Sequence, residues 1–206
     1  FGLPFNGGSQ DSAFYVLKTI LDTPLLRFEG FHFHLGSQIE DPSCYAEALE
    51  RLEAFILGAR KQLGEFGVNT LDIGGGLPAP YGRRVPTPKE MASRIVGQLN
   101  SLIESIGQRF TLVSESGRYL TAESTVLVSR IVNTKNFGES KYVYVDSGYH
   151  VLLDSALLRH EYPVEVVPGG RPSPRRIVLV GRLCDPLDVF PTSSRSKLEE
   201  RKPESW

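Results

Sequence analysis

Helix-like and strand-like segments alternate through the first 114 residues, and this order constrains the fold more than any other feature of the chain. Apolar residues recur at helical spacing in three segments, 11–22, 41–64 and 87–106. Short apolar or β-prone runs separate and follow them, at 25–34, 70–73 and 110–114. Parallel strands covered by helices produce this order. The sequence therefore predicts an α/β fold, either a barrel or an open sheet.

Beyond about Thr121 the pattern changes, because strand-like runs follow one another without helices between them. These runs lie at 124–132, 141–145, 162–167 and 176–180. Gly, Pro and Asn residues mark turns between them, which is typical of antiparallel sheets. We therefore expect one domain at 1–120, an antiparallel β domain at 121–190 and a loose, charged tail at 191–206.

Composition excludes several classes of function. The 206 residues carry a formal net charge of −1, which gives no basic field for nucleic acid. No apolar run reaches the roughly 18 residues that a membrane helix needs. Two cysteines, Cys44 and Cys184, lack the spacing of a zinc site or a disulfide framework. We expect a cytoplasmic protein with free thiols, no metal site, and no nucleic-acid or membrane partner.

Glycine follows each strand of the first half. Gly74, Gly75 and Gly76 come directly after a buried strand, and Gly117 with Arg118 follows the next one. Backbone without Cβ atoms can approach an anion closely, and a guanidinium can bind phosphate through two hydrogen bonds. Taken alone, the three glycines could equally form a turn. Parallel strands would bring both segments to one edge, which favours a phosphate site.

Three further side chains fit a phosphorylated aromatic ligand at this edge. His34 could lie flat on an aromatic ring while the hydroxyl of Ser37 contacts the phosphate. Glu115 could pair with a protonated pyridine nitrogen. The alternatives are a structural role for His34 and an ion pair between Glu115 and Arg118.

Five words carry a resemblance to a known family: FHFHLGSQ, LDIGGGLP, ESGRYLTAE, VDSGYH and GRLCDPLDV. In this order and spacing, over residues 1 to 190, they resemble the fold type III pyridoxal-phosphate-dependent decarboxylases, the ornithine/diaminopimelate decarboxylase group related to alanine racemase. The resemblance implies a TIM-type (β/α)8 barrel followed by a β domain. Residues 1–120 would be the C-terminal part of that barrel and 121–190 part of the β domain.

The resemblance also implies a role for each site residue. His34 would stack on the pyridine ring and Glu115 would pair with its nitrogen. The phosphate would be held by Ser37, Gly74, Gly75, Gly76, Gly117 and Arg118. Cys184 would return a proton to the substrate carbon, and Asp185 would bind the distal amine of the substrate. In this family the last two come from the partner subunit, so a homodimer is implied. A free cysteine is otherwise commonly a small buried apolar residue.

The chain also departs from the family pattern. Its lysines lie in predicted helices, turns or the tail, so we expect the strand with the cofactor-linking lysine, and the C-terminal end of the β domain, to lie outside these residues. The isolated chain is therefore expected to be inactive and not to fold as a stable monomer, because a partial barrel exposes two sheet edges. Asp154 and Leu158 stand where diaminopimelate decarboxylases have arginine and tyrosine.

The substrate and the activity remain open between several readings. Ornithine, lysine and diaminopimelate all carry a distal amine, and siderophore, antibiotic or polyamine metabolism would fit. The alternatives are a non-catalytic, decarboxylase-like regulatory protein, a racemase of the same fold, and a binding protein for another phosphate ligand.

Overall fold

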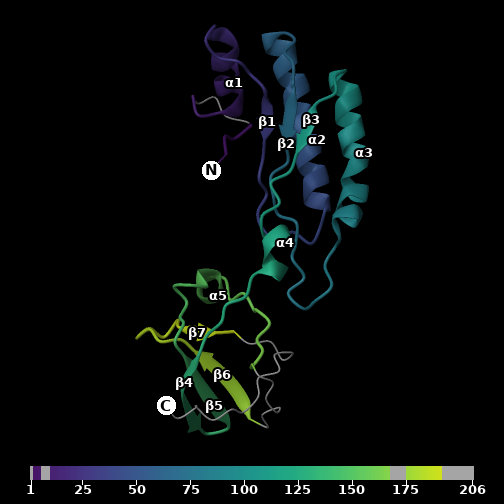
Figure 1. The fold of residues 1–206 in the computed structure, drawn as a ribbon. Helices are drawn as coiled ribbons and strands as arrows, with labels where there is room; N and C mark the ends of the chain where they lie inside the picture. The colour runs from purple at the N-terminus through teal and green to yellow at the C-terminus, as the bar shows by residue number, and fades with distance from the viewer. Residues whose placement is uncertain (1, 6–9, 168–174, 192–206) are drawn as a thin grey trace. The chain divides into compact units, whose positions relative to one another are not determined.

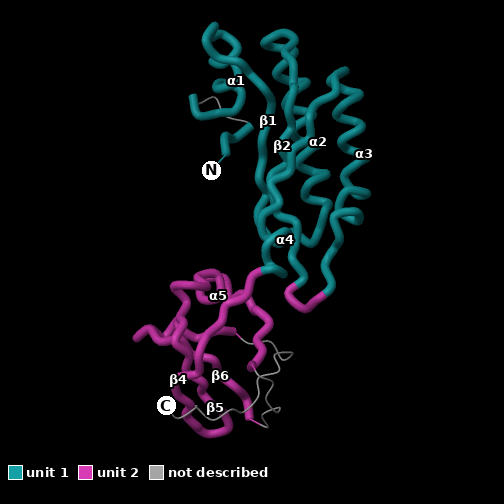
Figure 2. Tube along the Cα trace, in the orientation of Figure 1, with its two compact units in different colours: residues 1–80, 84–124 teal, residues 81–83, 125–206 magenta. Residues whose placement is uncertain are grey.

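The structure is a computed structural model, and it describes residues 2–5, 10–167 and 175–191. The chain forms two compact units (Figure 2). Unit 1 comprises residues 1–80 and 84–124, and unit 2 comprises 81–83 and 125–206. The tail predicted at 191–206 lies outside the described residues except for Pro191.

Unit 1 is a parallel sheet with helices packed against it (Figure 1). Its strands lie in the order β1 (Gly30–His32), β2 (Thr70–Asp72) and β3 (Thr111–Val113). Its helices are α1 (Ala13–Asp22), α2 (Ser43–Leu63), α3 (Pro88–Ile106) and α4 (Arg118–Thr121), with a short 3-10 turn at Ala122–Ser124. The predicted alternation is confirmed. The strands are shorter than predicted. The strand predicted at residues 25–34, for example, is observed only at Gly30–His32.

Local sequence signals explain where the helices begin. The Ser12 side chain accepts a hydrogen bond from the Tyr15 backbone and starts α1. Thr87 and Glu90 form a reciprocal capping box at the start of α3, with Pro88 as its first residue. Gly107, at a φ of 66°, ends that helix in the left-handed conformation.

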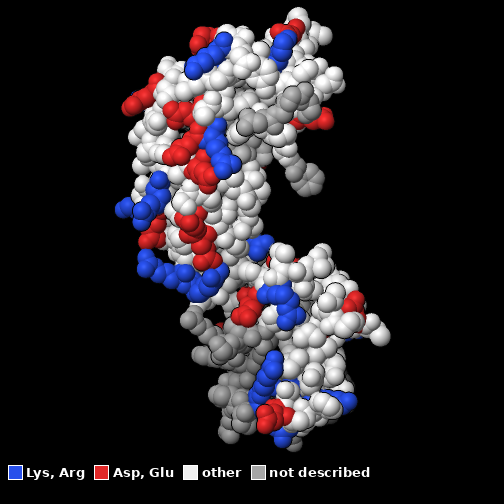
Figure 3. All heavy atoms as spheres, turned by 180° about the vertical axis from the view of Figure 1, so that it is seen from behind, with Lys and Arg blue, Asp and Glu red and all other residues white. Residues whose placement is uncertain are grey.

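One hydrophobic core joins α1, α2 and α3 of unit 1 to β2. Helices α2 and α3 pack against each other, and β2 contributes Leu71, which is fully buried. The remaining buried apolar residues of this core are Leu17, Tyr45, Leu49, Leu52, Ile56, Ala59, Phe66, Val68, Ile73, Met91, Ile95, Leu102 and Ile106. The apolar stripes of the two long helices are therefore explained by packing, and charged side chains of both signs lie outside (Figure 3).

The described residues of unit 2 form a four-stranded mixed sheet with one short helix. Its strands are β4 (Ile131–Phe137), β5 (Ser140–Val145), β6 (Arg176–Val180) and β7 (Val189–Phe190), in that order, and its helix is α5 (Leu153–Leu157). The prediction of purely antiparallel pairing is wrong for β5 and β6, which pair in parallel. The long connection that contains α5 allows this, since parallel neighbours need a crossover.

Two predicted strands of unit 2 also differ from the structure. Strand β4 begins only at Ile131, and the preceding Val126 and Val128 are 82% and 86% exposed. The run 162–167 makes isolated bridges at Tyr162 and Glu165 instead of a strand. Among the described helices, none combines the length and the apolar character that crossing a membrane requires.

Candidate active site

The carboxyl ends of β1, β2 and β3 meet at one edge of the sheet in unit 1. Asp72 is in register with His32 on one side and with Val113 on the other. The ladder continues past the strands, because Phe33 N–H donates to Asp72 O at 3.0 Å and Glu115 N–H donates to Gly74 O at 2.9 Å. The segments that the sequence singled out, around His34, Gly74 and Glu115, therefore lie at this common edge.

Close approach of the backbones explains the three glycines. A Cβ on Gly75 would lie 2.6 Å from the carbonyl oxygen of Glu115, and one on Gly74 would lie 2.5 Å from that of Phe33. Gly76 has a φ of 108°, and a Cβ there would lie 2.7 Å from the Tyr45 hydroxyl. Because no side chain fits at these positions, glycine lets the three strand ends converge.

Two of the glycine N–H groups hold side chains of the site. Gly74 N–H donates to Asp72 Oδ1 at 2.9 Å, and Gly75 N–H donates to His34 Nδ1 at 3.2 Å. With Nδ1 accepting, the hydrogen of a neutral His34 ring lies on Nε2. The exposed imidazole is thereby fixed in orientation at the sheet edge. In this structure the amides of Gly74 and Gly75 orient side chains.

Glu115 meets a histidine that the sequence analysis had not singled out. His32 Nε2 lies 3.3 Å from Glu115 Oε2, and the two side chains are 54% and 53% exposed. Asp72 lies beside them. One ring nitrogen of His32 and one carboxylate oxygen each from Asp72 and Glu115 lie within 4.8 Å of one another. The signal for His32 was its spacing of two residues from His34, which places both on one face of an extended segment.

Tyr45 is a second residue that the sequence analysis missed. It lies in α2, is 4% exposed, and its hydroxyl donates to Gly75 O at 2.6 Å. Burial raises the pKa of this phenol, so it stays a neutral donor. A cavity of about 30 Å³ beside it is lined by both Gly74 and Gly75. Helical spacing could not separate Tyr45 from an ordinary core aromatic.

The remaining predicted phosphate ligands also belong to unit 1. Ser37 is exposed in the loop after β1, and Gly117 precedes the single turn of α4. Gly117 O accepts from Leu120 N–H at 3.0 Å, which sets the first turn that carries Arg118. No lysine of the described residues immediately follows β1, β2 or β3.

Cys184 and Asp185 lie in unit 2, in the loop between β6 and β7. Cys184 is an exposed free thiol, not the small buried residue that a free cysteine commonly is. Asp185 accepts hydrogen bonds from Tyr149 Oη at 3.1 Å and from Leu187 N–H at 2.8 Å. The hydrogen bond to Asp185 raises the pKa of Tyr149.

Known proteins are similar to this chain in both sequence and fold. Diaminopimelate decarboxylase of Archaeoglobus fulgidus is 33% identical over 163 residues, which cover 78% of this chain and 38% of that protein. The Methanocaldococcus jannaschii enzyme is 27% identical, covering 92% of this chain and 42% of its own length. The chain thus spans about two fifths of these relatives.

Solved structures agree with these relatives. M. jannaschii diaminopimelate decarboxylase in complex with L-lysine superposes with a TM-score of 0.77 at 25% identity, over 87% of this chain and 41% of that one. Lysine/ornithine decarboxylase of Vibrio vulnificus with cadaverine gives a TM-score of 0.75 at 26% identity, over 92% and 51%. The predicted partial barrel followed by a β domain is confirmed by these neighbours.

A family comparison extends over more than half of the chain. The model for the pyridoxal-binding domain of pyridoxal-dependent decarboxylases matches residues 1–122, which include His34, the three glycines and Glu115. The chain therefore belongs to the family of pyridoxal-dependent decarboxylases.

Proposed function

We propose that this chain forms part of a pyridoxal-phosphate-dependent decarboxylase that acts on an amino acid with a distal amine. One observation carries the proposal: the exposed Glu115 carboxylate and the oriented His34 ring share the edge where β1, β2 and β3 end. Family membership supports the same chemistry.

The residues at this edge fit the cofactor. A carboxylate at Glu115 favours a protonated pyridine nitrogen, and the His34 ring offers a flat face for stacking. Ser37, Gly76, Gly117 and Arg118 supply hydroxyl, amide and guanidinium donors for the phosphate. Gly74 and Gly75 act through the side chains that their amides hold. When bound, pyridoxal phosphate supplies an electron sink for the electron pair that the departing CO₂ leaves at the α-carbon.

Unit 2 supplies the groups that would act on the substrate. The exposed Cys184 thiol would return a proton to the α-carbon after CO₂ leaves, and the Asp185 carboxylate would bind the distal ammonium. We propose that both reach the site of a partner subunit in a homodimer.

The substrate class follows from charge. Relatives have been solved with L-lysine and with cadaverine, which share a distal amine. Asp154 stands where the family resemblance implies an arginine for a second carboxylate, and its Oδ2 accepts from Tyr162 Oη at 2.6 Å. A second carboxylate on the substrate would be repelled there. We therefore propose lysine or ornithine in preference to diaminopimelate.

A product assay on the full-length protein tests this proposal. The protein with pyridoxal phosphate is incubated with lysine, ornithine or diaminopimelate, and CO₂ and the product amine are quantified. We expect CO₂ with cadaverine or putrescine, and strong loss of both products in Glu115→Gln. Inversion of the substrate without CO₂ would show a racemase, and no turnover despite bound cofactor would favour a regulatory relative.

A further inference from the structure

Asp188 is a fully buried carboxylate in unit 2 to which the proposed reaction assigns no role. It is 0% exposed and stands just before β7. Burying a carboxylate is costly unless hydrogen bonds compensate it. Its two oxygens accept from different segments: Oδ1 from Tyr149 N–H and Oδ2 from Leu183 N–H, each at 2.7 Å. Hydrogen bonds of this charged kind are the stronger ones.

These two donors belong to two motifs of the sequence. Tyr149 ends the VDSGY segment after β5, and Leu183 directly precedes Cys184. A further backbone bond joins the same segments, since Arg182 N–H donates to Ser147 O at 2.9 Å. Tyr149 also reaches Asp185 through its hydroxyl. The VDSGY segment, to which the sequence analysis gave no role, is thus joined by hydrogen bonds to the loop that carries Cys184.

The space around Asp188 is filled on two sides. A Cβ on Gly181 would lie 2.2 Å from Asp188 Oδ2, and one on Gly148 would lie 3.1 Å from the same oxygen. Backbone bonds close the loop at its base, because Gly181 N–H donates to Asp188 O at 2.9 Å. Glycine at 148 and 181 is therefore explained by the carboxylate that lies against both.

We propose that Asp188 is a positioning residue that holds the loop of Cys184 and Asp185 against the Ser147–Tyr149 segment in one conformation. Its relevance to catalysis rests on the proposed function, in which Cys184 is the proton donor. Asp188 does not touch the reacting atoms. It acts through the N–H of Leu183, the residue beside Cys184.

A fluorine probe on Cys184 tests the conformation of the loop without using activity. In the full-length protein, Cys44→Ser removes the second thiol of this segment, and any thiols elsewhere are replaced likewise. Cys184 then receives a trifluoromethyl label. We expect one sharp ¹⁹F line in the parent. Asp188→Asn, whose amide nitrogen cannot accept an N–H, should give several or broadened lines.

Two further variants keep the test decisive. Gly181→Ala should reproduce the line change, because its Cβ displaces the intact carboxylate, and it replaces Asp188→Asn if that variant does not fold. Val143→Ala, a core change in β5 of the same unit, serves as the control for lowered stability. A single unshifted line in Gly181→Ala or folded Asp188→Asn, or the same broadening in Val143→Ala, would overturn the inference.

Kinetics then separate the inference from the proposed function. Losing one hydrogen bond to a buried carboxylate corresponds to a change of about tenfold in an equilibrium or rate constant. We therefore expect Asp188→Asn to lower kcat by about tenfold, with little change in KM. Full activity of Cys184→Ala would contradict the proton-donor role, while the ¹⁹F lines would still decide the role of Asp188. Unchanged kcat in Asp188→Asn, where Cys184→Ala is impaired, would overturn the inference alone.

Discussion

His32 and Glu115 form a half-exposed contact at the edge of the sheet, with 3.3 Å between Nε2 and Oε2. In the proposed site, the carboxylate would pair with the cofactor nitrogen, and His32 contacts this same carboxylate. A contact with this exposure is worth about 0.2–1 kcal/mol. His32 is thus expected to adjust the orientation of Glu115 and not to decide whether cofactor binds.

Replacing His32 should weaken binding of pyridoxal phosphate modestly. We expect His32→Ala to raise the Kd about two- to fivefold, because the orienting contact is lost. Fluorescence titration of full-length apoprotein measures this, and His32→Gln, whose amide can still donate, is the matched control. A hundredfold loss in His32→Ala would show instead that His32 contacts the cofactor.

The hydrogen bond between Tyr149 and Asp185 should make the stability of the fold depend on pH. Its hydrogen bond to Asp185 raises the pKa of the phenol in the folded protein above the unfolded value. The bond therefore stabilises the fold fully below the unfolded pKa, and its contribution is lost as pH rises through the raised pKa. Thermal melts from pH 8 to 11 should fall more steeply for the parent than for Tyr149→Phe. Parallel curves would contradict this assignment.

The sequence marks some candidate site residues and leaves others unmarked for physical reasons. His34 and Glu115 are recognisable because each stands where a strand runs into glycine. Asp188 and Tyr45 each bond to backbone that is distant in the sequence, at Tyr149 and Gly75, and no local spacing reveals such partners. Nor does spacing reveal that the N–H groups of Gly74 and Gly75 donate to the Asp72 and His34 side chains.

At the scale of elements, the strand ends require glycine because they converge. Gly75→Ala would place a Cβ 2.6 Å from the carbonyl oxygen of Glu115. We expect a loss of about 1–3 kcal/mol in the free energy of unfolding, together with weaker cofactor binding. Urea unfolding measures the change in the free energy of unfolding. In the control, Gly97→Ala, the Cβ meets nothing within 4 Å on an exposed face of α3 and should stabilise by about 0.5–1 kcal/mol. Equal effects would contradict the convergence.

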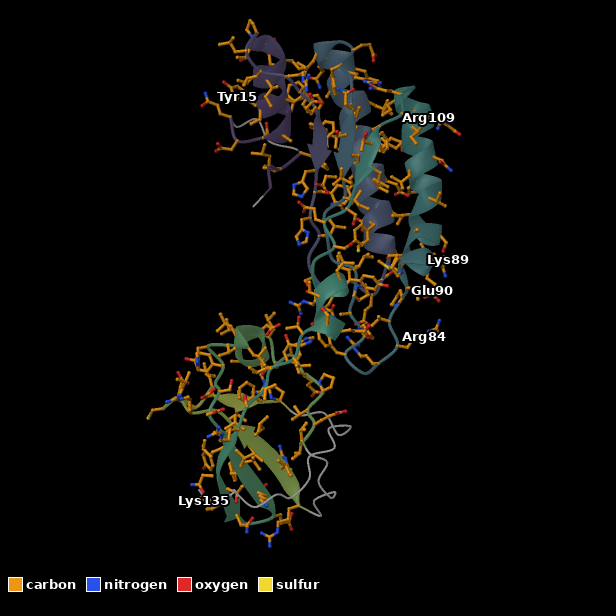
Figure 4. All side chains as sticks on the ribbon, viewed as in Figure 1. Tyr15, Arg84, Lys89, Glu90, Arg109 and Lys135 are labelled. Atoms are coloured by element: carbon orange, nitrogen blue, oxygen red, sulfur yellow. The ribbon has the colours of Figure 1, made fainter. Side chains whose placement is uncertain are left out.

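The start of α3 offers a second test at this scale. The side chains of Thr87 and Glu90 each accept a hydrogen bond from the other residue's backbone N–H. The Nη2 atom of Arg84 also lies 2.9 Å from Oε1 of Glu90, and Figure 4 labels both residues. Thr87→Ala should lower the free energy of unfolding by about 1 kcal/mol. Thermal melts at pH 7 check this, with Thr87→Ser as the control that keeps the hydroxyl cap. An unchanged melt in Thr87→Ala would contradict the cap.

The capping box also has a pH signature. Hydrogen bonds from Thr87, with a smaller contribution from Arg84, lower the pKa of Glu90. Its stabilising contribution is therefore present above the unfolded pKa and is lost as pH falls through the lowered value. Melts between pH 5 and 2 should show a smaller acid-induced loss in Glu90→Gln than in the parent protein.

Elements with local signals were predictable, and so was the parallel pairing of unit 1, whereas the pairing in unit 2 was not. The helices α1 and α3 follow from their caps and apolar spacing. The parallel pairing of β5 with β6 depends on a long connection, and strand direction leaves no mark in the strand itself. The strand predicted at 25–34 is shorter in the structure, because its register with β2 covers Gly30–His32 and only backbone hydrogen bonds at Glu29 and Phe33 extend it.

At the scale of the whole molecule, the described sheet of unit 1 has β1 and β3 at its edges. Edge strands offer backbone groups for pairing with another chain. Residues 1–206 expressed alone should therefore self-associate, as sedimentation velocity would show. Leu112→Lys, on partly exposed β3, should reduce this association. A monomer with a sharp, cooperative melt would contradict the expectation.

In the proposed site, the ends of β1, β2 and β3 bind pyridoxal phosphate through Glu115, His34 and Arg118. Calorimetric titration with pyridoxal phosphate measures this binding in the full-length apoprotein, in Glu115→Gln, in Arg118→Ala and in the surface control Arg109→Ala. Saturable binding that weakens at least tenfold in the two site variants and stays unchanged in Arg109→Ala is the expected result. Absence of binding, or equal affinity in all four proteins, would contradict the claim.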